Sequence, residues 1–161
     1  METLRRDLHR VVGTVIIYRP DQSYLITKRS KTRKVFPGKW VVPGGGLEVD
    51  DYINDAPTHG LQWYGALEKA LRRELREEVN VEVGKLEYLL DLVFIRPDKI
   101  PVLTLSFYAP YKSGEVKIND ESEEFAWIRA SDVSKFDFIE GVDEEIEMVE
   151  KIISEKLGFT L

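Results

Sequence analysis

The chain carries three consecutive glycines in segment 43–48 and, farther along, a predicted helix over 66–79 that ends in clustered glutamates. Glu74, Glu77 and Glu78 stand at positions i, i+3 and i+4, so their carboxylates share one face of that helix. Two unit charges about 4 Å apart repel by roughly 4 kcal/mol at an effective dielectric near 20. The cluster therefore favours a bound divalent cation, and its oxygen ligands favour Mg²⁺ or Mn²⁺, which commonly act on phosphates.

A solvated acidic helix face is the alternative interpretation of these three glutamates. On an exposed helix, like charges at this spacing cost only about 0.2–0.5 kcal/mol per pair. Taken alone, the three glutamates favour a solvated helix face. The residues upstream of the helix instead favour a metal site.

Hydrophobic patterns predict the other elements of the chain. Strands are expected over 10–18, 23–29, 40–42, 86–95, 101–109 and 124–128, and a closing amphipathic helix over 142–157. Helix 66–79 has its own apolar stripe, made by Leu67, Leu71, Leu75 and Val79. Strands and helices interspersed along 161 residues favour one α/β domain over residues 1–161, an α/β/α sandwich with a mixed β-sheet.

Two segments together resemble the sequence signature of the Nudix hydrolase family, of the MutT-like kind. The first is Gly-Gly-Gly-Leu-Glu at 44–48, and the second is Arg-Glu-Leu-Arg-Glu-Glu at 73–78. The flanks fit as well, with Phe-Pro-Gly-Lys-Trp at 36–40 and Trp-Ile at 127–128. The resemblance spans roughly residues 10–150 and implies the same α/β/α sandwich.

This sequence departs from the family signature at three places. Residues 49–63 contain an insertion of about fourteen residues between the glycines and the helix. Gly65 stands where the signature has a helix-opening glutamate, so that carboxylate is missing or is replaced from the insertion. Asn80 replaces the closing glycine, a mild change because Asn also tolerates the left-handed conformation of a helix C-cap.

The resemblance implies Mg²⁺- or Mn²⁺-dependent hydrolysis of a diphosphate bond in a nucleoside diphosphate linked to another moiety. Glu74 and Glu78 are the expected metal ligands, and Glu77 is either a ligand or the base that activates water. A backbone carbonyl of the glycine segment, that of Gly45, completes the expected metal shell, although the segment could simply be a turn. Arg73 is expected to orient a glutamate through a charge-assisted hydrogen bond; a plain surface arginine is the alternative.

A further carboxylate is expected from the segment before Trp127. Glu121, Glu123 and Glu124 compete for this role, and Glu123 is our choice because it stands at the entrance of the strand expected from 124. A solvated acidic loop is the alternative. Glu48 is expected to brace the glycine segment.

Charge is unevenly distributed along the chain. Residues 1–42 carry ten Lys and Arg against three Asp and Glu, whereas residues 43–161 carry thirteen against twenty-six. The densest basic run, 28–34, is either a solvated loop or a phosphate-facing rim opposite the metal. On the second interpretation Arg29 and Lys39 contact the substrate. With a pI near 5.1, a nucleic-acid partner is less favoured than a small nucleotide.

The insertion is expected to form an ordered flap over the substrate mouth and to help select the substrate. Long loops inside compact domains are usually functional or disordered, and the aromatic residues here oppose disorder. Trp63 is expected to contact substrate, although Trp63 and Tyr64 are more often core residues, and His59 is expected to be a polar loop residue. A surface elaboration or an oligomer contact is the alternative for the whole segment.

Composition sets the remaining expectations. The chain has no cysteine, and Met1–Asp7 lacks an apolar signal core, so a cytoplasmic enzyme without membrane contact is expected. A homodimer is left open. A non-catalytic Nudix-like module that binds a nucleotide or a partner is the alternative function, and the presence of all three helix glutamates counts against it.

Overall fold

The computed structural model describes residues 6–158; residues 159–161 and residues 1–5, most of the stretch tested above for a signal core, lie outside it. Its strands are β1 Arg10–Tyr18, β2 Ser23–Arg29, β3 Trp40–Val41, β4 Gly44–Gly46, β5 Glu82–Val83, β6 Glu87–Ile95, β7 Pro101–Ser113 and β8 Ser122–Arg129. Its helices are the two α-helices α1 Ala66–Val79 and α2 Val142–Lys156, and the 3₁₀ helices η1 Val49–Asp51 and η2 Ala130–Lys135. No helix within residues 6–158 is long and apolar enough to cross a membrane.

The eight strands form a mixed sheet, as predicted. β1 runs parallel to β7 over its whole length, from Arg10 beside Val102 to Tyr18 beside Pro110. The other pairings are antiparallel: β2 pairs with β1, β3 and β8, while β6 and β5 pair with β7. The β2–β8 pairing brings the segment before Trp127 alongside the start of the basic run.

The glycine segment is a short strand rather than the turn expected from the sequence. β4 pairs antiparallel with β1, with Gly44 beside Thr14 and Gly45 beside Gly13. A Cβ atom on Gly44 would lie 2.2 Å from the carbonyl oxygen of Gly13. Backbones this close leave no room for a side chain, so position 44 requires glycine for the strand pairing.

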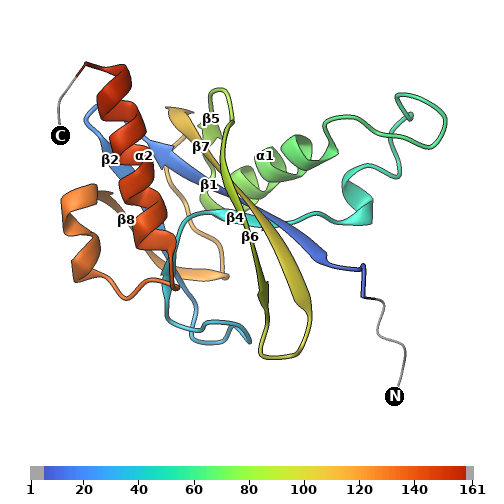
Figure 1. The fold of residues 1–161 in the computed structure, drawn as a ribbon, viewed down its shortest axis with the longest axis horizontal. Coiled ribbons are helices and arrows are strands. Elements are labelled where there is room, and N and C mark those ends of the chain that lie inside the picture. The colour runs from blue at the N-terminus through green and yellow to red at the C-terminus, as the bar shows by residue number, and fades with distance from the viewer. Residues whose placement is uncertain (1–5, 159–161) are drawn as a thin grey trace.

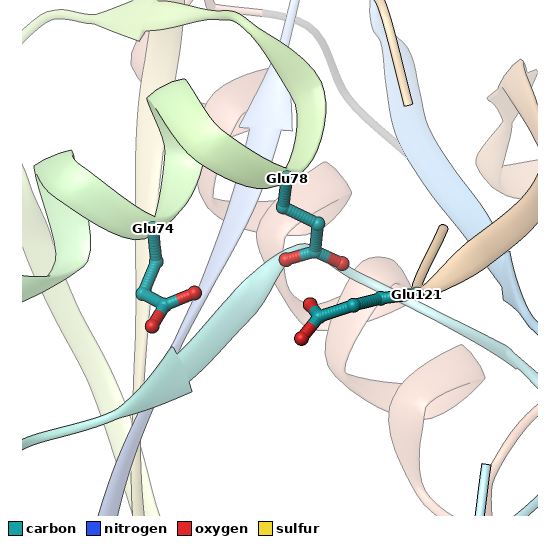
Figure 2. Close-up of side chains that lie close together, drawn as sticks. All are labelled: Glu74, Glu78 and Glu121. Atoms are coloured by element: carbon teal, nitrogen blue, oxygen red, sulfur yellow. The ribbon is translucent and has the colours of Figure 1, made fainter. Parts of the chain in front are cut away.

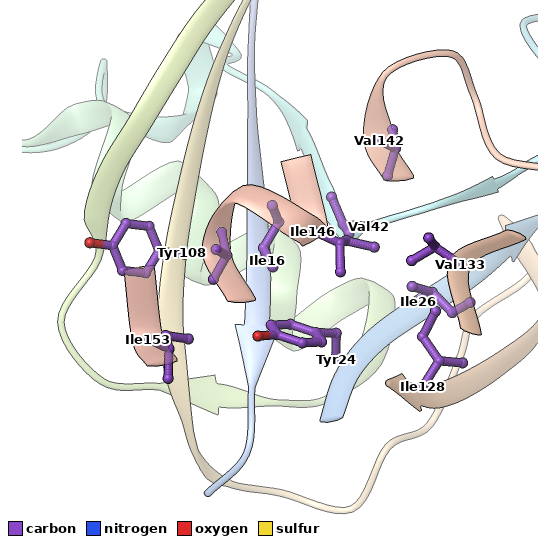
Figure 3. Packing of buried hydrophobic residues seen from close by; sticks show 11 residues of the cluster. Ile16, Tyr24, Ile26, Val42, Tyr108, Ile128, Val133, Val142, Ile146 and Ile153 are labelled. Carbon is purple, nitrogen blue, oxygen red and sulfur yellow. The ribbon is translucent and has the colours of Figure 1, made fainter. Parts of the chain in front are cut away.

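Two hydrophobic cores cover the two faces of the sheet, with α1 on one face and α2 on the other (Figure 1). Val15 and Ile17 of β1 pack with Leu71 and Leu75 of α1, whereas Ile16 between them packs with α2. Figure 3 shows this second core, in which the buried members are Ile16, Tyr24, Ile26, Val42, Tyr108, Ile128, Val133, Val142, Ile146, Val149 and Ile153. Strands buried on both faces require continuous apolar runs, and this explains why β1 and β2 lack a polar–apolar alternation.

Most predicted elements are confirmed. β1, β2 and α1 have the predicted bounds, and Asn80 caps α1 in the left-handed conformation with φ 58°. The main differences are at strand ends: β7 continues to Ser113, and β8 begins at Ser122 rather than at Glu124. The sequence reading missed β5, η1 and η2, which are too short to show a periodicity.

Candidate active site

Three carboxylates meet where the end of α1 faces the loop before β8 (Figure 2). Glu74 and Glu78 come from consecutive turns of α1, and Glu121 comes from the residue that precedes β8. One oxygen of each lies within 4.8 Å of the others. This is the only such group of acidic, histidine or cysteine side chains found in residues 6–158.

Glu78 is the most buried member of the cluster. Its Oε2 accepts a hydrogen bond from the backbone N–H of Gly44, at 3.1 Å, which ties the helix to β4. Burial raises the pKa of Glu78 to about 7; the charges of Glu121 and Glu74 add to this, while the Gly44 bond and Arg29 oppose it. A buried carboxylate with two acidic neighbours needs positive charge nearby to stay ionised.

Glu74 is held between the glycine strand and an arginine. A Cβ atom on Gly45 would lie 2.3 Å from its carboxyl carbon, so this glycine makes room for the acid. Burial raises the pKa of Glu74, and the guanidinium of Arg73, 3.0 Å from its Oε1, opposes the rise. The predicted contact of Arg73 with a glutamate of the signature, here Glu74, is therefore present in the structure.

Glu121 takes the place for which the sequence favoured Glu123. Because β8 begins at Ser122, the residue at the strand entrance is Glu121. Glu123 instead lies 3.2 Å from the ammonium nitrogen of Lys28, which also pairs with Glu124 at 3.5 Å. The structure therefore does not bring Glu123 into the cluster; the choice of Glu123 rested on a strand start two residues too late.

Asn119 fixes Glu121 relative to α1, and nothing in the sequence indicated this role for Asn119. Its side-chain oxygen accepts the backbone N–H of Glu121 at 3.1 Å. Its side-chain amide donates to the carbonyl of Glu77 at 3.2 Å, and its backbone N–H donates to the carbonyl of Glu78 at 3.3 Å. One asparagine thus joins the last turn of α1 to the loop that supplies the third carboxylate.

Glu77 stands apart from the cluster. Its side chain is 57% exposed, and its Oε2 accepts a hydrogen bond from Arg73 Nη1 at 2.8 Å. The structure therefore brings Glu74 and Glu78 together and leaves Glu77 beside the arginine.

The acidic cluster opens into a cavity of about 880 Å³. Arg29 and Arg33 contribute positive charge to its lining; Arg33 Nη1 lies 3.2 Å from Glu121, and burial lowers the pKa of Arg29. Another part of the lining is apolar or uncharged, with Leu92, Phe94 and Val102 from β6 and β7 and with Thr104 and Ser106 from β7. Glu145 of α2 adds one carboxyl to the lining. Anionic and apolar parts of one ligand can therefore be accommodated together.

Glu145 is a second site residue that the sequence reading missed. Its carboxyl is buried, and burial raises its pKa, opposed by a hydrogen bond with Ser106. It lies in the first turn of α2, where the pattern showed an ordinary run of acidic residues. Only the packing of α2 on the sheet distinguishes it from its exposed neighbours.

Two of the three residues predicted to contact substrate lie outside the cavity lining. Arg29 lines it, but Lys39 is on the surface, where its ammonium nitrogen pairs with Asp137 at 2.7 Å. Trp63 stays within the insertion: its indole N–H donates to the carbonyl of Asp55 at 3.0 Å, and its ring packs on Tyr52.

The insertion does not form the predicted flap over this cavity. None of residues 49–63 belongs to its lining. Tyr64 is exposed rather than in the core, and its ring packs edge-on against His59, a polar loop residue as predicted. Glu48, immediately before the insertion, does line the cavity and pairs at 3.2 Å with Arg10, the first residue of β1; its bracing of the glycine strand stays a prediction.

Comparison with known proteins gives the class of this chain and then its family. Among solved structures, the MutT protein of Methanosarcina mazei Go1 has a TM-score of 0.69 at 18% identity, covering 89% of this chain and 94% of its own. The MutT NUDIX hydrolase of Burkholderia pseudomallei also has a TM-score of 0.69, at 23% identity, covering 89% of this chain and 99% of its own. These likenesses define the fold as that of the MutT-like hydrolases.

The NUDIX domain family model matches residues 7–150, and the chain belongs to this family. The nucleoside triphosphatase NudI of Escherichia coli (strain K12) is 32% identical over 127 residues, covering 73% of this chain and 80% of the relative. The chain is accordingly a pyrophosphohydrolase of nucleoside diphosphate derivatives. Enzymes of this family generally use a divalent metal, for which the acidic cluster supplies carboxylates.

Proposed function

We propose that the chain is a Mg²⁺-dependent nucleoside triphosphate pyrophosphohydrolase, with Mn²⁺ as the substitute ion. The observation that carries this proposal is the meeting of Glu74, Glu78 and Glu121 within 4.8 Å at the wall of a cavity that also has arginines. The triphosphate is favoured over a sugar nucleotide because the similar Escherichia coli protein is a nucleoside triphosphatase.

The donor set fits a hard divalent cation. All three side chains offer only carboxylate oxygens, the ligands that Mg²⁺ and Mn²⁺ prefer. Burial and mutual repulsion raise the pKa values of Glu74 and Glu78. A bound cation would lower both pKa values again, because it stabilises the ionised carboxylates. We propose the backbone carbonyl of Gly45 as a further ligand, because Gly45 is the strand residue whose missing side chain leaves room for Glu74.

The protein's own groups would position the phosphates and the attacking water. A divalent ion, when bound, neutralises charge on phosphate oxygens and makes a water more acidic. Arg29 and Arg33 would attract the phosphate chain into the cavity. We propose Glu77 as the proton acceptor for the attacking water, because it lies one turn after Glu74 on α1 and Arg73, which also contacts Glu74, holds its carboxylate.

The rest of the cavity would receive the nucleoside. Leu92, Phe94 and Val102 provide apolar contact, and Glu145 provides one buried carboxyl. A buried carboxyl offers two oxygens that can form hydrogen bonds with the polar edge of a base. We therefore propose that Glu145 reads the base.

A substrate panel tests the function. Nucleoside triphosphates, sugar nucleotides, ADP-ribose and dinucleoside polyphosphates are incubated with millimolar Mg²⁺, and release of phosphate or pyrophosphate is scored. We expect triphosphates to be turned over fastest, and chelation with EDTA to abolish turnover. Full turnover in EDTA would refute the metal-dependent mechanism, and faster turnover of ADP-ribose or a sugar nucleotide would refute the substrate assignment.

Two further expectations from the sequence stay predictions, a single domain over 1–161 and a cytoplasmic location, and the sequence left one question open, whether the protein forms a homodimer. Gel filtration with light scattering measures the last of these directly.

A further inference from the structure

Part of one face of the sheet is left uncovered by α1. Val11 of β1 is paired with Leu103 of β7, and Leu103 is paired with Val93 of β6, so all three point to the same side of the sheet. Val15 packs with α1 on that side, because residues an even number of positions apart along a strand share a face. None of the three belongs to either hydrophobic core. With their neighbours they form an apolar area, here called the open face, which consists of Val11, Val93, Ile95, Leu103 and Leu105.

The open face is most exposed at the edge of the sheet. Val93 is 66% exposed, and Ile95 is 69% exposed. Among residues 6–158, β6 pairs only with β7, so the other edge of β6 has no strand beside it. Edge strands commonly carry lysine or proline, which discourage pairing with another chain, and Glu87–Ile95 contains neither. An apolar area on such an edge is typical of a surface that another chain covers.

The insertion has the opposite shape. Residues 49–63, here called the arm, project from the body of the domain beyond the start of α1 (Figure 1). At the tip of the arm, the backbone N–H of Gln62 donates to the carbonyl of His59 at 2.7 Å and closes a turn around Leu61. Leu61 is 86% exposed, and Ile53 of the arm is 48% exposed. The arm therefore presents apolar side chains to the solvent.

Contacts within the arm hold it in this position. The ring of Trp63 packs on that of Tyr52, and its indole N–H donates to the carbonyl of Asp55 at 3.0 Å. The carboxylate of Asp55 pairs with Lys69 of α1. An arm that is already folded loses little conformational entropy when it binds, which favours association.

The arm and the borders of the open face carry opposite charge. Residues 49–63 contain three aspartates and no lysine or arginine, which gives −3. The open face is bordered by segment 6–10 before Val11 and by segment 96–100 after Ile95. Each of these segments has two Lys or Arg and one Asp, so together they carry +2. Opposite charges favour the approach of an arm to an open face.

A single chain thus carries both members of a complementary pair of surfaces. In a two-fold symmetric dimer, each copy would offer its arm and receive the arm of the other, and the assembly would close without leaving either surface free. The arm has fifteen residues, and the open face with its two bordering segments has fifteen more. Stable interfaces use roughly 20–30 residues on each side, so the two surfaces are large enough together.

We propose that the protein is a two-fold symmetric homodimer in which the arm of each protomer covers the open face of the other, with Leu61 at the contact. Neither the arm nor the five residues of the open face line the cavity. The inference is therefore independent of the proposed function, and turnover and Tm serve as checks that each variant is folded.

Leu61→Glu alters the arm, and Val93→Glu alters the open face. Met148→Glu is the matched control, because Met148 is apolar and 44% exposed but belongs to α2, on the other side of the sheet. Sedimentation equilibrium measures the dimer dissociation constant, and light scattering should give wild-type protein about twice the chain mass of 18.6 kDa. We expect Leu61→Glu and Val93→Glu to raise that constant at least about 100-fold, because each damages both contacts of a symmetric dimer. Met148→Glu should stay within about twofold of wild type.

Mixing the two variants tests whether arm pairs with face. Each variant alone can form only dimers in which both contacts are damaged. A mixed dimer has one contact damaged on both sides and one contact intact. The mixture should therefore associate at least about 10-fold more tightly than either variant alone.

Three results would overturn the inference. The first is wild-type protein that stays monomeric at about 100 μM. The second is a wild-type dissociation constant for Leu61→Glu, because the dimer would then form without the arm, for example through two β6 edges. The third is a mixture that associates no better than its components.

A cross-linking experiment keeps the test usable if Val93→Glu does not fold. The chain has no cysteine, so two introduced thiols are the only ones present. With a short bis-maleimide, the double variant Leu61→Cys/Val93→Cys should give covalently linked dimers in high yield, while Leu61→Cys/Met148→Cys and each single variant should not. Equal yields from the two double variants would contradict the pairing of arm with open face.

Discussion

Two parts of the same cavity hold buried carboxyl groups in opposite circumstances. In the acidic part, Glu78 has Glu74 and Glu121 as neighbours, and both the burial and the neighbouring charges raise its pKa. In the apolar part, Glu145 is alone, and burial by itself raises its pKa. The desolvation cost of a single buried carboxylate can be relieved by protonation. Three neighbouring carboxylates also repel one another, and a bound cation relieves both effects. Clustering, rather than burial, therefore distinguishes the proposed metal site from the proposed base-reading residue.

The largest expected effect comes from the acidic part. Glu78→Gln should lower kcat at least about 100-fold, on the order of 3 kcal/mol of transition-state stabilisation. The Tm of the metal-free protein should hold or rise, because a repulsive buried charge is removed. Steady-state kinetics and thermal melts in EDTA measure both quantities.

Glu123→Gln is the control for this variant, because Glu123 pairs with Lys28 outside the cluster. It should stay within about twofold of wild type, while Glu121→Gln should lose at least about 10-fold in kcat. If the Glu123 variant loses more than the Glu121 variant, the assignment of the third carboxylate is wrong.

The apolar part should respond in substrate preference rather than in metal binding. Glu145→Gln replaces the carboxyl by an amide, and we expect the ratio of kcat/KM between the best and second-best nucleobase to change about 10-fold, roughly 1.4 kcal/mol. Mn²⁺ affinity should remain within about twofold. An unchanged base preference together with weakened Mn²⁺ binding would reverse the roles given to the two parts.

Both parts should make the metal-free protein less stable as the pH rises. The folded pKa values of Glu74, Glu78 and Glu145 are raised above those of the unfolded chain, so the folded state binds more protons between the two values. The free energy of unfolding should thus fall from pH 5 to pH 8, most steeply below about pH 7, where Glu78 titrates. We expect a loss of at least about 1 kcal/mol, since one pKa unit corresponds to about 1.4 kcal/mol.

Urea unfolding in EDTA at several pH values measures this dependence. Saturating Mg²⁺ should reduce it, because the cation holds the clustered carboxylates ionised. Glu78→Gln should reduce it as well. A free energy of unfolding that increases between pH 5 and pH 8 in EDTA would contradict the raised pKa values.

The smallest effects are expected outside both parts. Lys39→Ala removes an exposed ion pair with Asp137, and Trp63→Phe removes one hydrogen bond inside the insertion. Exposed ion pairs contribute about 0–1 kcal/mol to the stability of the fold. Because neither side chain lines the cavity, kcat and KM should stay within about twofold of wild type for both variants. A KM raised about 10-fold by either variant would restore the substrate contacts first expected from the sequence.

Local patterns were sufficient for the elements that carry the site. The helix over 66–79 follows from an apolar stripe at helical spacing, and the juxtaposition of Glu74 and Glu78 follows from helix geometry alone. The strands over 10–18 and 23–29 follow from continuous β-branched and aromatic runs. These features depend on neighbours within a few residues, which a sequence displays directly.

Contacts between distant segments decided the rest. Glu121 reaches the cluster because it is the residue immediately before β8, which starts at Ser122. Asn119 also connects this loop to α1 through hydrogen bonds. Asp51 reaches Arg73 because η1 turns the insertion back onto the helix. For the third carboxylate, Glu121, Glu123 and Glu124 competed, and their order along the chain did not reveal which one the packing would bring into the cluster. Residue spacing determined that α1 presents clustered glutamates on one face; tertiary structure alone determined which carboxylates meet there, because burial and register are properties of the folded chain.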